Sequence, residues 1–120
     1  MSLRDTILTA DDLEESVEDV PEWDVKILLR GMTGKQRIRL VERVSAKGPD
    51  REFMYSDILI ATALDPETQD LVFDPADREA LAGKAGGVLE RLALKVMKLS
   101  GVSVEDAEEE IQADPTSVGA

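Results

Sequence analysis

Apolar and polar residues alternate most regularly between residues 23 and 29. This alternation predicts a half-buried strand, because successive side chains of an extended chain point to opposite faces. Gly31 follows closely and is expected to end the strand. The apolar side of the pattern consists of Trp23, Val25, Ile27 and Leu29, with Asp24 and Lys26 between them. We therefore expect Trp23 to be substantially buried in a small sheet.

A helical pattern is clearest from about residue 87 to residue 100. Apolar residues recur there three and four positions apart, and charged residues fill the opposite arc. Gly101 suits the C-terminal stop, where glycine tolerates a left-handed backbone. The apolar face consists of Leu89, Leu92, Ala93, Val96 and Leu99. We expect this helix to be central to the core, and Leu89, Leu92 and Val96 are also candidates for an apolar partner-binding face.

A second helix is predicted for residues 34–46, with Thr33 as its N-cap. Lys35, Arg39 and Arg43 follow one another four positions apart and form a basic line on one face. Three interpretations of this line stay open: a docking surface for an anionic partner, a solvated face, or a region that neutralises the protein's own acidic arm. The apolar stripe of the helix is formed by Leu40, Val41 and Val44.

Three further helices are predicted from their start signals. A weak, mostly solvated helix is expected between Thr9, as N-cap, and Pro21, which stops it. A short helix is expected for residues 74–83, because an aspartate followed by proline is a strong start. Two turns of helix are expected for residues 103–111, where a capping-box pattern precedes spaced apolar residues.

The segment 53–64 is ambiguous, because its apolar run suits either a buried strand or one turn of a buried helix. Residues 65–68 predict a turn, and residues 71–73 a short strand. Together these patterns predict an α+β fold: a mostly helical single domain with a small β-sheet and acidic N- and C-terminal arms.

Charge divides the chain into three blocks. Residues 1–24 hold nine acidic residues and one basic residue (−8), residues 102–120 hold six acidic residues and none that is basic (−6), and residues 25–101 hold thirteen basic and eleven acidic residues (+2). We assign an acidic N-terminal arm to residues 1–22, a compact α+β domain to residues 23–101 and an acidic C-terminal helix and tail to residues 102–120. A core of this size is marginal, and association into a homo-oligomer would extend it.

The chain contains no histidine and no cysteine, which limits the catalytic and metal-binding sites that it can form. The commonest general base and metal ligand is missing, and so are thiolates and the usual zinc sites. Four acidic residues cluster at positions 65, 67, 70 and 74, but the glycine that a calcium loop needs at its sharp turn is missing. We therefore expect a solvated turn there, and no catalytic residue, metal or cofactor anywhere in the chain.

The net charge of −12 and the pI of about 4.3 disfavour binding to nucleic acid or anionic lipid. No apolar run approaches the roughly 20 residues that a membrane span needs. The lack of cysteine suits a reducing cytoplasm. We expect neither a nucleic acid nor a membrane as partner.

The order of these features resembles that of the tail assembly chaperones of long-tailed phages and prophages. The similarity extends from Trp23 to about Glu110. The matching pieces are, in order, WDVKILLRGMT at residues 23–33, the basic helix at 34–44, ILIATALD at 58–65, LVF at 71–73, DPADREAL at 74–81 and LSGV at 99–102.

This resemblance implies a non-enzymatic role in phage tail assembly. Proteins of this family bind the tape measure protein, a long helical chain that is prone to aggregation, and they help the tail tube protein to polymerise around it. The family therefore implies the tape measure protein and the tail tube protein as partners. It also implies that the protein acts in the host bacterial cytoplasm and is absent from the mature virion.

Two other classes of function compete with this interpretation. An acidic regulatory inhibitor, such as a DNA mimic or an antitoxin-like binding protein, needs carboxylates fixed on a folded surface. Here the centre of the chain carries +2 and the acids are at the ends. An enzyme is disfavoured by the absence of histidine and cysteine.

The candidates for partner binding combine the basic line of the second helix with the apolar face of the last one: Lys35, Arg39, Arg43, Leu89, Leu92 and Val96.

Overall fold

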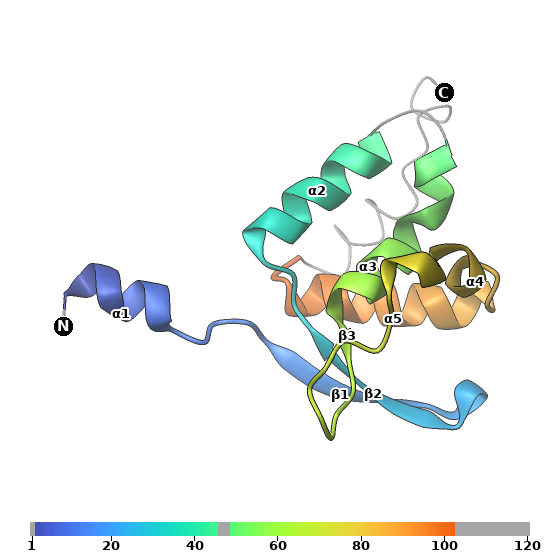
Figure 1. Ribbon diagram of the computed structural model, residues 1–120, viewed down its shortest axis with the longest axis horizontal. Coiled ribbons are helices and arrows are strands. Elements are labelled where there is room, and N and C mark those ends of the chain that lie inside the picture. The colour runs from blue at the N-terminus through green and yellow to red at the C-terminus, as the bar shows by residue number, and fades with distance from the viewer. Residues whose placement is uncertain (1, 46–48, 103–120) are drawn as a thin grey trace.

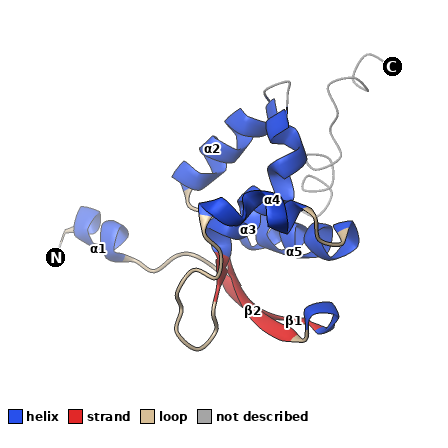
Figure 2. Ribbon diagram, turned by 45° about the vertical axis from the view of Figure 1, so that its right-hand side comes forward, coloured by secondary structure: helices blue, strands red, loops and turns tan. Residues whose placement is uncertain are grey.

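A small sheet lies along one side of a layer of helices (Figures 1 and 2). The computed structural model describes residues 2–45 and 49–102, and for residues 44, 45, 49 and 50 it describes the backbone alone. In this part of the chain the fold is α+β, with mostly helical structure and one antiparallel sheet. The predicted fold class is confirmed.

Three strands form the sheet, in the order β1-β2-β3. β1 (Glu15–Val20) and β2 (Val25–Arg30) form an antiparallel hairpin that turns through the 3₁₀ helix η1 (Pro21–Trp23). Asp24 completes the turn in the left-handed region, with a φ of 54°. β3 (Ala63–Leu64) pairs with the other edge of β2. The register places four aliphatic residues opposite one another across the sheet: Val17, Leu28, Leu64 and Leu71.

The helix predicted for residues 9–20 is wrong. The helix in this region is α1 (Leu3–Thr9), which ends where the predicted one was to begin, and β1 follows it. Contacts that are distant in sequence favour the strand, because Arg30 donates a hydrogen bond to Glu15 at 2.7 Å across the ladder, and Val20 is 0% exposed. The charged residues of this segment offer no apolar helical face to compete. Part of the expected acidic arm is therefore a strand.

The strand predicted for residues 23–29 is present, but its buried face differs from the prediction. Residues 27–29 are all buried, whereas Val25 is 45% exposed. Val25 lies beside the turn at the end of the ladder, where fewer neighbours can cover it. Trp23 lies in η1 rather than in the strand, and it is half-buried against the core.

α5 (Gly86–Leu99) is central to the core, as predicted. Its residues Leu92, Ala93 and Val96 are exposed by 1% or less. The helix ends in a Schellman motif, in which Gly101 has a φ of 89° and the N–H of Val102 donates to the carbonyl of Met97. Gly101 is therefore the predicted C-terminal stop.

α3 (Met54–Thr62) resolves most of the ambiguous segment 53–64 as a helix, and its last two residues form β3. The strand predicted for residues 71–73 is not formed, since Leu71 makes only an isolated bridge to Leu64. The buried residues of α3 are Met54, Ser56, Ile58, Leu59 and Thr62. Their spacing gives the helix one face on the core and leaves the opposite side open to α2.

α2 (Gly34–Ser45) begins at the predicted cap. The N–H of Gln36 donates to Thr33 Oγ1 at 3.1 Å, and the N–H of Thr33 donates to Gln36 Oε1 at 2.9 Å. This reciprocal pair is a capping box, which satisfies two backbone donors that a helix start leaves free.

Short helices complete the described fold. η2 (Pro49–Phe53) leads into α3, and η3 (Pro75–Asp77) leads into α4 (Arg78–Ala82). Asp74 caps η3 as predicted, with the aspartate at the third position closing the box. Figure 1 shows α1 lying apart from the other helices. The helix predicted for residues 103–111 lies outside the described residues.

Candidate partner-binding groove

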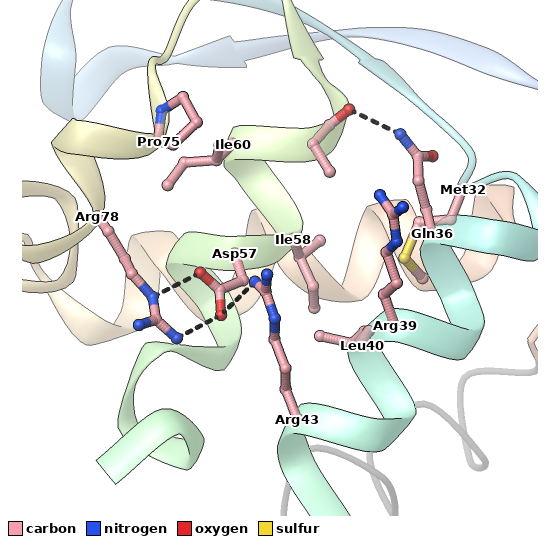
Figure 3. Close-up of a pocket in the computed structure, with 11 residues that line it drawn as sticks. Met32, Gln36, Arg39, Leu40, Arg43, Asp57, Ile58, Ile60, Pro75 and Arg78 are labelled. Atoms are coloured by element: carbon pink, nitrogen blue, oxygen red, sulfur yellow. Dashed lines mark hydrogen bonds and ion pairs between the residues drawn. The ribbon is translucent and has the colours of Figure 1, made fainter.

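α2 and α3 enclose a groove whose cavity has a volume of about 390 Å³ (Figure 3). Most of its walls come from these two helices, with contributions from the segment before α2, from η3 and from α4. The lining residues are Met32, Gln36, Arg39, Leu40, Arg43, Asp57, Ile58, Ile60, Ala61, Pro75 and Arg78. The groove therefore combines an apolar floor with several arginines.

Asp57 lies at the junction of three helices. Its side chain is only 7% exposed, and Arg78 of α4 donates two hydrogen bonds to it, Nε to Oδ1 at 2.8 Å and Nη2 to Oδ2 at 2.9 Å. Arg43 of α2 places Nη1 3.3 Å from Oδ2. Arg78 also lies over the ring of Phe53, 4.2 Å from its centroid. One carboxylate therefore ties α2 and α4 to α3 through charge-assisted contacts.

Gln36 links the two helices at the other end of the groove. Its Nε2 donates to the carbonyl of Ala61 near the end of α3, at 3.3 Å (Figure 3). The oxygen of the same amide accepts the capping hydrogen bond from Thr33. The residue that helps to start α2 therefore also links this helix to α3.

The predicted basic line divides between the groove and the open surface. Arg39 and Arg43 line the groove, and Figure 3 shows both side chains extending from α2 into it. Lys35 is exposed and is not among the lining residues. Arg43 contacts Asp57, whereas Arg39 forms no ion pair with any residue that the structure describes. Arg39 is therefore the cation of this line that lines the groove without an ion pair to a described residue.

The apolar partner-binding candidates lie in the core. Leu89, Leu92 and Val96 are 3%, 1% and 0% exposed. They are on α5, which contacts α3 and β2. In this conformation they support the groove from within and cannot themselves form a surface for a partner.

Asp57, Arg78 and Gln36 were not predicted from the sequence. A signal for Asp57 was present, because it is the single charge within the apolar run of residues 54–61, and a buried charge needs a partner. Nothing local pointed to Arg78, which is 21 residues away in the chain.

The groove suits recognition of carboxylates better than catalysis. Its lining holds three arginines and one aspartate, a net charge of +2. Both oxygens of Asp57 accept from arginine, so this carboxylate is poorly placed to act as a general base. A peptide helix with an apolar face and neighbouring acidic residues would match both the floor and the arginines.

Carboxylates in the 65–77 segment stabilise the backbone. Asp65 Oδ1 accepts from the N–H of Glu67 at 2.8 Å, and Asp74 caps η3. Within residues 2–45 and 49–102, no group of three or more metal-ligating side chains is placed to hold an ion. No helix in the same ranges has both the length and the hydropathy to cross a membrane.

Acidic residues of the β-hairpin pair with cations on α5. Arg91 donates to Glu22 through two hydrogen bonds, at 2.7 and 3.0 Å. These bonds are the main reason that the pKa of Glu22 falls from 4.5 to about 2, and they also raise the pKa of Arg91. Glu18 lies 3.5 Å from Lys95. Two ion pairs therefore hold the hairpin against α5.

A comparison with solved structures gives a match to the bacteriophage HK97 tail assembly chaperone. The two chains are 23% identical, with a TM-score of 0.61, and the match covers 80% of this chain and 91% of the HK97 chain. No family model matches the chain, and no curated protein matches it. The similarity to HK97 shows a shared fold, and at that level it confirms the resemblance predicted from the sequence.

Proposed function

We propose that this protein is a non-enzymatic phage tail assembly chaperone. It binds the tape measure protein, keeps it soluble and promotes polymerisation of the tail tube protein around it. It acts in the host bacterial cytoplasm and is absent from the mature virion. The proposal is carried by the fold shared with the HK97 tail assembly chaperone over 80% of the chain, in agreement with the order of the sequence features.

The groove between α2 and α3 is the proposed client-binding site. A helical client presents apolar residues three and four positions apart, and Ile60, Ala61 and Pro75, which line the groove and are not buried, offer apolar surface to receive them. Arg39 and Arg43 would pair with acidic residues beside that apolar face. Because both arginines are exposed, their contribution to binding falls as salt increases.

The acidic inhibitor is less well supported by the described residues. A DNA mimic needs carboxylates that are free to act as phosphates on a rigid surface. Glu15, Glu18 and Glu22 lie on or beside the rigid hairpin, but each is paired with a cation of its own chain. These carboxylates therefore serve the fold of the hairpin and its contact with α5.

Co-expression with the tape measure protein of the same phage or prophage tests the proposal. The amount of soluble client and the complex that survives gel filtration are measured. We expect both to rise in the presence of this protein. Arg39→Glu should weaken the complex by roughly 5–30-fold, which corresponds to about 1–2 kcal/mol for one reversed charge.

Lys84→Glu is the matched control for this substitution. It makes the same change of charge at an exposed position between α4 and α5, away from the groove lining. It should leave the complex unchanged. The chaperone interpretation fails if the client precipitates equally with and without this protein and no complex is recovered.

A further inference from the structure

The described chain ends beside the groove. The N–H of Met32, which lines the groove, donates to Ser100 Oγ at 2.8 Å. Val102, the last described residue, is 6% exposed and belongs to the core cluster. The chain therefore leaves the domain next to one wall of the groove, and residues 103–120 continue from that point.

Charge and apolar spacing in residues 103–120 complement the groove. The segment contains six acidic residues and no basic residue, a charge of −6. α2 contains four basic residues and one acidic residue, a charge of +3. Apolar residues of the segment recur three and four positions apart, as helix-in-groove contacts require: Val104, Ala107 and Ile111.

We propose that residues 103–120 dock in the α2–α3 groove of their own chain. Val104, Ala107 and Ile111 pack against the apolar groove residues that are not buried, Ile60, Ala61 and Pro75, and the acidic residues pair with Arg39 and Arg43. The segment is long enough to reach the groove, because 18 residues span up to about 60 Å when extended and about 27 Å as a helix. Tethering gives a short segment an effective concentration in the millimolar range, so even a weak contact is populated.

Docking makes the segment an internal competitor of the client. A client that needs the groove binds only the fraction of molecules whose groove is free, so its apparent affinity falls by that fraction. The segment also covers apolar surface until a client arrives, which limits unspecific association. This competition rests on the proposed function, whereas the docking itself does not.

Paramagnetic NMR on the full-length protein tests the docking without any client. The chain contains no cysteine, so Gln112→Cys provides a single thiol for a nitroxide label. We expect strong broadening of amide signals beside the groove, such as those of Gln36 and Ala61. Signals of Asp19 and Lys26 should stay sharp, because they lie by the hairpin turn, away from α2 (Figure 1).

Charge substitutions in the labelled protein separate specific docking from random collisions. Arg39→Glu should lower the ratio of docked to undocked molecules by about fivefold, and Lys84→Glu should leave this ratio unchanged. Combining Arg39→Glu with Glu108→Lys, Glu109→Lys and Glu110→Lys should restore the broadening at the groove.

Equal broadening over both faces of the domain, or broadening that does not respond to Arg39→Glu, would overturn the docking. If groove signals broaden but no client binds in the co-expression test, the proposed function fails and the docking stands. If the client binds but groove signals stay sharp, the docking alone fails.

Discussion

Gly31 shows how closely the end of β2 approaches the end of α5. A Cβ added there would lie 2.7 Å from the carbonyl oxygen of Leu99, which is a backbone atom and cannot rotate away. Gly31→Ala should therefore lower the free energy of unfolding by about 1–3 kcal/mol, the range for overpacking. Urea denaturation followed by circular dichroism measures the change. Gly34→Ala is the control, since its Cβ would meet nothing within 4 Å, and a similar loss there would contradict the argument.

Single residues with a local role were predictable from the sequence. Thr33, Asp74 and Gly101 act as the caps and the stop that their neighbours indicated, because a cap depends on only a few adjacent backbone groups. The contact between Asp57 and Arg78 was not predictable, because it depends on how α4 returns against α3. The arginines of α2 were predicted as a line, but their opening onto a groove depends on the same packing.

Elements with an apolar period of their own were predicted better than elements that depend on a partner strand. α5 carries its own apolar face, and its position in the core follows from that face. β1 has no such face, and it becomes a strand because β2 pairs with it through six residues. Val25 and Trp23 were misplaced for a related reason, since the turn through η1 bends the chain away from regular alternation.

The contact between the hairpin and α5 should give stability a specific dependence on pH. Arg91 lowers the pKa of Glu22 to about 2 in the folded protein, from an ordinary value of 4.5. A lowered folded pKa means that the charged form is stabilised above pH 4.5, and that this contribution is lost as the pH falls toward 2. Glu22→Gln should therefore flatten the fall of the urea midpoint between about pH 5 and pH 2.

Glu79→Gln is the control for this prediction. Glu79 is exposed on α4 and has no ion pair among the described residues. Its substitution should leave the pH profile of the parent protein unchanged in shape. If the urea midpoint depends on pH in the same way for Glu22→Gln and for the parent protein, the Arg91 contact does not contribute to the pH dependence of stability.

At the scale of the whole molecule, the helical layer and the hairpin share one core. Residues from β1, β2, α2, α3, α4 and α5 all contribute buried side chains to it. The predicted α+β class followed from the apolar patterns, but the acidic N-terminal segment was expected outside this core. Val20 of β1 lies in it instead, with 0% exposure, so the hairpin contributes to the shared core.

Leu92→Ala tests whether this shared core unfolds as one unit. Leu92 is 1% exposed, so its truncation should lower the free energy of unfolding by about 2–5 kcal/mol. Trp23 is the single tryptophan, and it is half-buried in η1. Its fluorescence therefore reports on the hairpin, whereas far-ultraviolet circular dichroism reports on the helices. The urea midpoints measured by the two methods should coincide and shift together. Lys84→Ala, at an exposed position, should change stability by less than about 0.5 kcal/mol. A comparably small loss for Leu92→Ala would remove α5 from the core, and separate midpoints would mean that the hairpin unfolds independently of the helices.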